Sequence, residues 1–270
     1  MTTRHHILVR ASQRGYSLFE MILVIVIIGI LAAITMRSLR GAGEAARTEE
    51  TRAEMDRLAW AIAGDPGLVS GGHRTDYGYV GDVGALPPTL EALAVNPGLA
   101  TWRGPYVHDD FKTSAGAPES SFRIDAWGRP YAYAGVAITS TGGRIPLTRR
   151  LAPDAGRLLR NTVTVVVTDL ADSPPGARYV DSLAVILTVP NGLGGLVERR
   201  RTPRPDGFAE FDSVPIGAHL LRLVYTPAAD TLRRRVAVEP GQHAHLDLQY
   251  PAEERVGGWC VNEAQQVGAD

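Results

Sequence analysis

The sequence has one cysteine, Cys260, among 270 residues, which excludes an intramolecular disulfide framework and any metal site built from several cysteines. Lys112 is its single lysine, so the positive charge is carried almost entirely by arginine. The formal net charge of -1 argues against a generally basic nucleic-acid binder. The chain also has no glycine-rich phosphate loop, nucleophile elbow or paired Cys and His ligand set. We therefore expect no catalytic residues, no cofactor and no bound metal.

A long apolar run near the N-terminus is the main feature that is present. Residues 21–36 contain no charged residue and no proline. A helix over residues 16–36 would be about 31 Å long, enough to cross a hydrocarbon core of about 30 Å. Arginines and no acidic residue precede Glu20, so the positive-inside rule places the N-terminus in the cytoplasm. We expect a single membrane span over residues 16–36.

Glu20 is unexpected in such a segment, because an ionisable group there costs about 2.5–3.5 kcal/mol on insertion scales. A partner would arise if the chain were cut after Gly15, since the new amine would then belong to Tyr16. Tyr16 and Glu20 are four residues apart and share a helix face, so the pair could form within one chain or between neighbours. Between neighbours, the pair would set the register of a helical bundle.

The stretch from Gly15 to Glu20, followed by the apolar run, resembles the leader of type IV prepilins and type II secretion pseudopilins. The resemblance implies that a prepilin peptidase cuts between Gly15 and Tyr16 and methylates the amine of Tyr16. It also implies that Glu20 guides the addition of subunits to a filament. Tyr16 departs from the phenylalanine that is usual in the family, and Met36 and Arg37 stand where many members have a proline. A plain signal anchor with a chance glutamate is the alternative.

The helix is predicted to continue to residue 63. An apolar stripe recurs at helical spacing in its second half, at Met55, Leu58, Ala59 and Ile62. The arginines and glutamates around this stripe are typical of a solvated face. Residues 64–67 contain the glycine and proline that end the helix. A helix this long fits a pilin stem, whose second half packs on a head.

Two segments of the following region are rich in aromatic residues, glycine and proline, namely Trp102–Val107 and Asp125–Tyr133. By themselves they indicate aromatic strand edges with Gly-Pro turns, whose rings pack on the helix. Together with Leu90–Leu93, which predicts a short helix, they resemble the motif series of the major, G-type pseudopilin of type II secretion. The resemblance implies packing roles in the head for Trp102, Gly104, Pro105, Tyr106, Asp125, Trp127, Gly128, Pro130 and Tyr131.

This series departs from the family in two places. Ala126 stands where the family usually has proline, and residues 137–144 contain no acidic residue where the family has a calcium-binding loop. A calcium ion needs six to eight oxygen ligands, several of them from carboxylates, so we predict no calcium there. The departures leave open whether the chain is a major or a minor subunit.

The last third of the chain alternates with period two. This pattern predicts strands over residues 162–168, 183–189, 207–211, 219–225, 232–238 and 243–250. Short strands at this spacing with Gly and Pro turns predict a small β-sandwich over residues 160–252. The segment resembles the transthyretin-like, carboxypeptidase-regulatory type of domain. The resemblance implies a module that binds a ligand or acts as a spacer between other domains.

Three features of the β-sandwich segment and the tail leave alternatives open. His243, His245 and Asp247 alternate onto one strand face and could hold a metal, although such a face is more often solvated. Two triple-arginine clusters, residues 199–201 and 233–235, either protect strand edges or attract an acidic partner or polymer. Cys260 is either a free thiol or an intermolecular link.

The predicted fold is α+β, with a long N-terminal helix packed on a small pilin-like β head and followed by a β-sandwich. The predicted segments are a leader (1–15), the long helix (16–63), the head (64–150), the β-sandwich (160–252) and a tail (253–270). The predicted function is a structural subunit of a type II secretion pseudopilus or a closely related type IV filament. The alternatives are a minor pilin or adhesin-like tip subunit whose β-sandwich binds a ligand, and an envelope anchor that never assembles.

The expected partners are prepilin peptidase, other pilin or pseudopilin subunits, an inner-membrane assembly platform and the membrane itself, but no nucleic acid. The expected location is the inner membrane, with a single span and a cytoplasmic N-terminus. The C-terminal domains would lie in the periplasm or in an extracellular filament.

Overall fold

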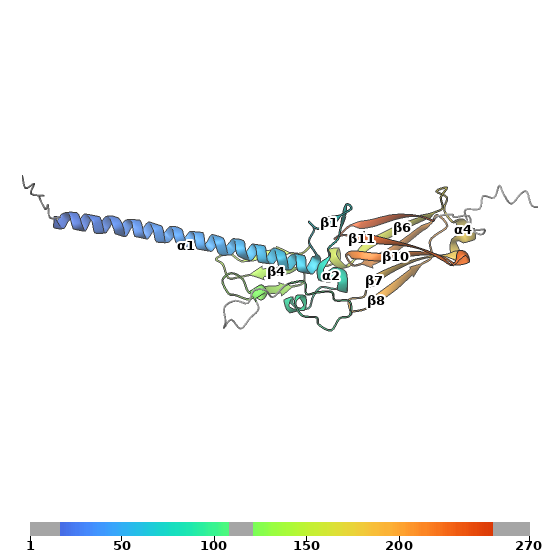
Figure 1. Cartoon of the computed structure of the whole chain (residues 1–270), viewed down its shortest axis with the longest axis horizontal. Coiled ribbons are helices and arrows are strands. Elements are labelled where there is room, and N and C mark those ends of the chain that lie inside the picture. The colour runs from blue at the N-terminus through green and yellow to red at the C-terminus, as the bar shows by residue number, and fades with distance from the viewer. Residues whose placement is uncertain (1–16, 108–120, 251–270) are drawn as a thin grey trace, which may run out of the picture. The chain divides into compact units, whose positions relative to one another are not determined.

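The computed structural model describes residues 17–107 and 121–250, and the chain divides into two units, residues 1–48 and 49–270. Helix α1, Leu18–Ala63, belongs to both units and is drawn in blue and cyan in Figure 1. Ser17 caps its start, because its Oγ accepts a hydrogen bond from the backbone N–H of Glu20 at 3.2 Å. The helix ends before Gly64, whose φ of +82° is a left-handed conformation that glycine adopts without strain.

The first half of α1 exposes its apolar side chains. Leu18 is 80% exposed, Phe19 76% and Ile25 69%. Among the described residues, no helix meets the combined length and hydropathy that a membrane crossing requires. The span expected over residues 16–36 therefore stays a prediction.

The second half of α1 buries the predicted apolar stripe. Met55 and Leu58 are 2% exposed and Ile62 is fully buried, which confirms the helical spacing expected from the sequence. These side chains share one hydrophobic cluster with Tyr79, Val80, Leu93 and other apolar residues of the next region. The stripe therefore fixes which face of α1 the following segments cover.

The middle region, residues 64–159, packs short elements and irregular segments on this face. Strands β3, β4 and β5 form a three-stranded antiparallel sheet in that order, and β1 and β2 form a two-stranded one. The elements are β1 (Val69–Ser70), β2 (His73–Arg74), α2 (Gly78–Val83), η1 (Leu90–Leu93), η2 (Ser121–Arg123), β3 (Ala132–Ala134), β4 (Ala137–Ser140), β5 (Leu147–Arg150) and α3 (Gly156–Leu159). The short helix predicted over residues 90–93 is confirmed as η1, with Leu93 fully buried.

The C-terminal region, residues 161–250, contains two sheets. Their strand orders are β11-β10-β7-β8 and β12-β6-β9, and β12 pairs with β6 in parallel. The elements are β6 (Asn161–Thr168), α4 (Gly176–Tyr179), η3 (Val180–Ser182), β7 (Leu183–Pro190), β8 (Leu196–Arg201), β9 (Phe208–Val214), β10 (Gly217–Tyr225), η4 (Thr226–Ala228), β11 (Asp230–Val238) and β12 (His243–Gln249). One hydrophobic cluster takes alternate residues from both sheets, including Val165, Leu187, Phe211 and Leu223.

The secondary structure departs from the sequence expectation in two places. The segment Trp102–Val107 contains no strand, and residues 125–133 contribute only the Ile124–Pro130 bridge and the start of β3. The prediction of aromatic strand edges is therefore largely wrong, because the rings are held by side-chain hydrogen bonds and not by a strand ladder. Strand β8 was not predicted, because it lies at a sheet edge where most of its side chains are exposed and show no alternation.

Candidate functional site

The N-terminal motif is only partly within the described residues. Gly15 and Tyr16, the predicted cleavage and methylation positions, lie outside them, whereas Glu20 lies in the first turn of α1. Its side chain is exposed among apolar neighbours such as Leu18 and Phe19. The described part of the motif thus presents one carboxylate on an otherwise apolar helix surface, and the role of Glu20 in subunit register stays a prediction.

Asp125 is the anchor of the second aromatic motif. Its carboxylate is 3% exposed and accepts four hydrogen bonds. Oδ1 accepts from the backbone N–H groups of Trp127 and Arg129, at 3.0 and 2.9 Å. Oδ2 accepts from the hydroxyl of Ser140 at 2.6 Å and from the N–H of Gly142 at 3.1 Å. These donors satisfy the buried charge and tie the turn that follows Asp125 to the end of strand β4.

Gly128 and Pro130 shape this turn. Gly128 has a φ of +79° and its N–H bonds to the Asp125 carbonyl oxygen at 2.7 Å, which is the geometry of a tight turn. Pro130 then pairs with Ile124 in an isolated antiparallel bridge. The motif residues therefore act together to reverse the chain and direct Tyr131 toward α1.

Two polar contacts join this motif to α1. The hydroxyl of Tyr131 donates to Glu54 Oε2 at 2.7 Å, and Thr51 Oγ1 accepts from the N–H of Ala126 at 3.2 Å. Burial raises the pKa of both Tyr131 and Glu54, so the tyrosine stays a donor. Neither Glu54 nor Thr51 was predicted as a site residue from the sequence. The signal for Thr51 in the sequence was its spacing, because it is four residues before Met55 and so continues the apolar stripe. The structure shows that Thr51 is fully buried.

The first aromatic motif is held by its own rings. Trp102 Nε1 donates to the carbonyl oxygen of Ala92 at 2.9 Å, and the Trp102 and Tyr106 rings meet edge to face with centroids 5.6 Å apart. The hydroxyl of Tyr106 donates to Asp82 Oδ2 at 2.8 Å. Burial raises the pKa of both of these groups. The structure thus brings the predicted packing residues of this motif against η1 and α2.

Gly104 and Pro105 complete this motif. The peptide bond between them is cis. A Cβ at Gly104 would lie 2.4 Å from the Trp102 ring, so only glycine leaves room for the indole. An apolar cavity of about 520 Å³ lies beside the motif, lined by Leu58, Trp60 and Ala61 of α1 and by Tyr106. The first aromatic motif thus contacts η1 and α2, and the second contacts α1, while the packing roles that the resemblance implies stay a prediction.

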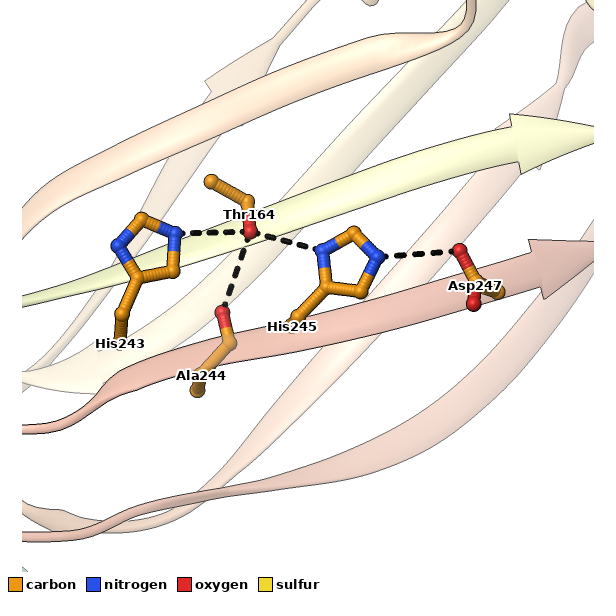
Figure 2. Close-up of polar contacts among 5 residues, drawn as sticks. All are labelled: Thr164, His243, Ala244, His245 and Asp247. Atoms are coloured by element: carbon orange, nitrogen blue, oxygen red, sulfur yellow. Dashed lines mark hydrogen bonds and ion pairs between the residues drawn. The ribbon is translucent and has the colours of Figure 1, made fainter.

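The histidines of β12 form a second polar cluster, around Thr164 of β6 (Figure 2). His243 Nε2 and His245 Nδ1 each lie 3.0 Å from Thr164 Oγ1, and His245 Nε2 lies 3.2 Å from Asp247 Oδ1. The parallel register places His245 directly opposite Thr164, which is 4% exposed. Within the described ranges, no group of three His, Cys, Asp or Glu side chains is arranged to hold a metal. The hydroxyl thus orients both imidazole rings, a partner that the alternation of β12 alone did not reveal.

The two arginine clusters lie on β8 and β11, the two edge strands of one sheet. Arg199 Nη1 donates to the carbonyl oxygens of Asp212 and Ser213 at 2.7 and 3.1 Å. The guanidinium of Arg201 lies 5.9 Å from the centroid of the Phe211 ring. These two side chains therefore cover the open edge between β8 and β9, as expected for charge that protects a strand edge.

Comparison with known proteins gives a family motif and one relative. Residues 10–36 match the prokaryotic N-terminal methylation motif. The chain is 30% identical over 99 residues to the type II secretion system core protein G of Xanthomonas campestris pv. campestris. The match covers 36% of this chain, and the chain spans 59% of the length of that protein.

Similarity to solved structures is weak. The Bacillus anthracis TIE protein matches with a TM-score of 0.27 and 17% identity, over 43% of this chain and 23% of that one. A TM-score this low indicates neither a shared fold nor a shared function. The N-terminal methylation motif, which is of the prepilin type, and the similarity to core protein G together support the pilin and pseudopilin family.

Proposed function

We propose that this chain is a structural subunit of a type II secretion pseudopilus or of a closely related type IV filament. The methylation motif over residues 10–36 carries the proposal. It leads into α1, whose first half exposes its apolar side chains and whose second half bears the middle region. The similarity to core protein G over 99 residues supports the same assignment. In this role the chain is a substrate of enzymes and not itself an enzyme.

The proposed mechanism begins with processing. A prepilin peptidase removes residues 1–15 and methylates the new amine of Tyr16. The first half of α1 then holds the subunit in the inner membrane, with its start at the cytoplasmic side and the middle and C-terminal regions in the periplasm. The apolar side chains of residues 18–33 supply a favourable free energy of burial, first in lipid and then against the helices of other subunits.

Glu20 sets the register during assembly. An unpaired carboxylate is costly in an apolar environment, and a neighbouring subunit's Tyr16 amine is the positive group that would relieve it. An inner-membrane assembly platform would extrude the subunits while this pair forms. Because Glu20 is exposed on α1, it is free to meet a partner from another chain.

The intact mass of the full chain, extracted from membranes with and without a co-expressed prepilin peptidase, tests the processing step. Loss of residues 1–15 together with the gain of one methyl group is the expected result, and a Gly15→Leu variant should keep the precursor mass. Resistance of the chain to alkaline extraction from membranes tests the proposed span. An uncut chain, or a cut elsewhere, would remove the filament proposal.

A Glu20→Gln variant tests assembly separately from processing. We expect it to be cut and methylated normally but to be lost from sheared filaments. Glu50→Gln is the matched control, because Glu50 is also an exposed glutamate of α1 but lies in its second half. Equal incorporation of both variants would exclude the proposed role of Glu20.

A minor pilin or adhesin-like tip subunit is the second candidate function. It is favoured by the C-terminal region, whose two sheets share a buried cluster and add bulk that would crowd a filament if every subunit carried it. In this version the two sheets form a β-sandwich that binds a ligand. Immunogold labelling of assembled filaments separates the two functions, because a tip subunit would be labelled only at filament ends.

A further inference from the structure

A row of arginines crosses the outer face of the sheet β11-β10-β7-β8. The registers place Arg200 of β8 opposite Ile186 of β7, Ile186 opposite Arg222 of β10, and Arg222 opposite Arg233 of β11. Residues opposite one another in antiparallel strands share a face. The adjacent positions Leu187 and Leu221 are buried in the core between the sheets, so the arginine row faces outward.

Arg235 lies two residues beyond Arg233 on β11 and therefore joins the same face. We call Arg200, Arg222, Arg233 and Arg235 the basic face. Glu198 is the single acidic strand residue on this side of the sheet, and it forms an ion pair with Arg222 at 2.6 Å. Arg200, Arg233 and Arg235 are exposed and form no ion pair with any residue that the structure describes. The basic face thus has an excess of positive charge.

The fold by itself does not account for this arrangement. Edge protection explains arginines on β8 and β11, but Arg222 is on β10, an inner strand. It stands directly opposite Arg233, and like charges in that position destabilise a sheet. Its Nε is also buried without a hydrogen-bond partner among the described residues. A bound anion would relieve the repulsion between Arg222 and Arg233, whereas the buried Nε lies beyond its reach.

The shape of the basic face indicates the kind of anion. Neighbouring strands lie about 4.8 Å apart, so the row from Arg200 to Arg233 is about 14 Å long and runs across the strands. Guanidinium groups bind carboxylate, sulfate and phosphate groups as bidentate pairs. A straight row of such groups fits charges that repeat along a polymer.

The remaining side chains of the face narrow the choice of polymer. Its strand residues include no aromatic ring on which the bases of a single-stranded nucleic acid could stack. The exposed apolar side chains of this face, Leu220 at 39% and Leu196 at 64%, do not make the broad apolar surface that would insert into a membrane. We infer that the basic face binds a linear acidic polysaccharide, whose chain lies across strands β8, β7, β10 and β11.

Binding of the full-length chain, purified in detergent, to immobilised polygalacturonate tests this inference. We expect binding at low salt that weakens as sodium chloride is raised, and no binding to neutral dextran. The double variant Arg233→Gln/Arg235→Gln should bind about tenfold more weakly, because it removes two exposed charges from the basic face. Absence of wild-type binding would overturn the inference.

Arg144→Gln/Arg178→Gln is the matched control, since it removes two exposed arginines that lie outside strands β8, β7, β10 and β11. It should bind within about twofold of the wild type, because only charges near the polymer contribute strongly. Equal weakening of both double variants would show that net charge alone is responsible and would overturn the inference. Equal or tighter binding to duplex DNA at the same salt would overturn the choice of polysaccharide. Circular dichroism of each variant verifies that it is folded.

This inference goes beyond the proposed filament role and does not depend on it. Removal of residues 1–15 and methylation can be measured by mass on the same variants and should be unchanged. Normal processing without polysaccharide binding would remove only this inference. Polysaccharide binding by a chain that is never processed would remove only the filament proposal.

Discussion

The middle region and the C-terminal region build their cores in different ways. The strands of the middle region are two to four residues long, and buried polar groups such as Asp125 hold the segments between them. The strands of the C-terminal region are six to nine residues long and pair along continuous ladders. In the middle region, side chains provide hydrogen-bond partners for backbone groups. In the C-terminal region, the backbone groups of neighbouring strands bond to one another.

This difference predicts where each region is vulnerable. In the middle region, removing one polar side chain leaves several buried donors without partners, and each of these has a desolvation cost. In the C-terminal region, the ladders survive the loss of a side chain, so the main cost is the cavity that the substitution leaves. Substitutions of the two kinds therefore test whether the two regions are stabilised differently.

Phe211→Ala should have the largest effect. Phe211 is 1% exposed in the core between the two sheets, and such a truncation costs about 3–5 kcal/mol of unfolding free energy. Denaturant unfolding of the processed chain in detergent measures the loss, and hydrogen exchange should place it first in residues 161–250. Leu220→Ala, on the exposed face of β10, is the control and should cost less than about 1 kcal/mol. Similar losses for both would mean that the sheets lack a specific core.

Asp125→Ala tests the polar anchor of the middle region. We expect a loss of about 3 kcal/mol, because four donors lose their acceptor and two of these belong to the turn itself. Asp181→Ala removes an exposed aspartate and should leave the unfolding free energy nearly unchanged. Hydrogen exchange should rise in residues 121–150 and not in the C-terminal strands. An effect as small as that of the control would contradict the anchoring role.

Tyr131→Phe and Tyr133→Phe form a matched pair. The first removes the hydroxyl that binds Glu54 and should cost about 1–2 kcal/mol. The second removes a buried hydroxyl that has no partner among the described residues and whose pKa burial raises to about 12, so it should be neutral or stabilising. Thermal and denaturant unfolding of both variants gives the comparison. If Tyr133→Phe is the more damaging change, the hydrogen-bond assignment is wrong.

His219 should give a small pH dependence. Burial lowers its pKa in the folded state, where the side chain is 4% exposed and Nε2 lies 2.7 Å from the Pro215 carbonyl oxygen. The unfolded state therefore binds a proton at about pH 6.5 that the folded state does not, and stability falls as the pH drops through that value. The slope is at most about 1.4 kcal/mol per pH unit.

The unfolding free energy at about pH 7.5 and pH 5, above and below the pKa of unfolded histidine, measures this slope. His219→Gln should reduce the difference between the two pH values, whereas His73→Gln, at an exposed position, should leave it unchanged. A slope that is the same in the wild type and in His219→Gln would show that other groups are responsible.

Much of the fold was predictable wherever a periodic pattern had one buried face. Met55, Leu58 and Ile62 indicated the covered face of α1, and alternation indicated six of the seven C-terminal strands. Strand β8 was not predicted, because a mostly exposed edge strand does not need alternating apolar and polar residues. The aromatic segments were recognised by their motifs but assigned the wrong backbone, since glycine and proline turns without a ladder resemble strand edges in a sequence.

The candidate site also has a part that was predictable from the sequence and a part that was not. The methylation motif is a local string of residues, so the leader, Glu20 and the apolar run that follows could be found without a structure. The partners of Asp125, the bond between Tyr131 and Glu54, and the rings gathered on Thr164 join residues that are far apart in the chain. Such contacts depend on which segments meet and in which register, and a linear pattern does not contain that information.

The basic face shows most clearly which properties follow from the sequence and which follow from strand pairing. The sequence alone determined that two arginine triplets exist, because composition and spacing are local properties. Only the pairing of β8, β7, β10 and β11 decided that Arg199 and Arg201 serve the sheet edge while Arg200 and Arg233 share an outward row with Arg222. The physical reason is that neighbouring residues of a strand point to opposite faces, so strand register decides which charges act together.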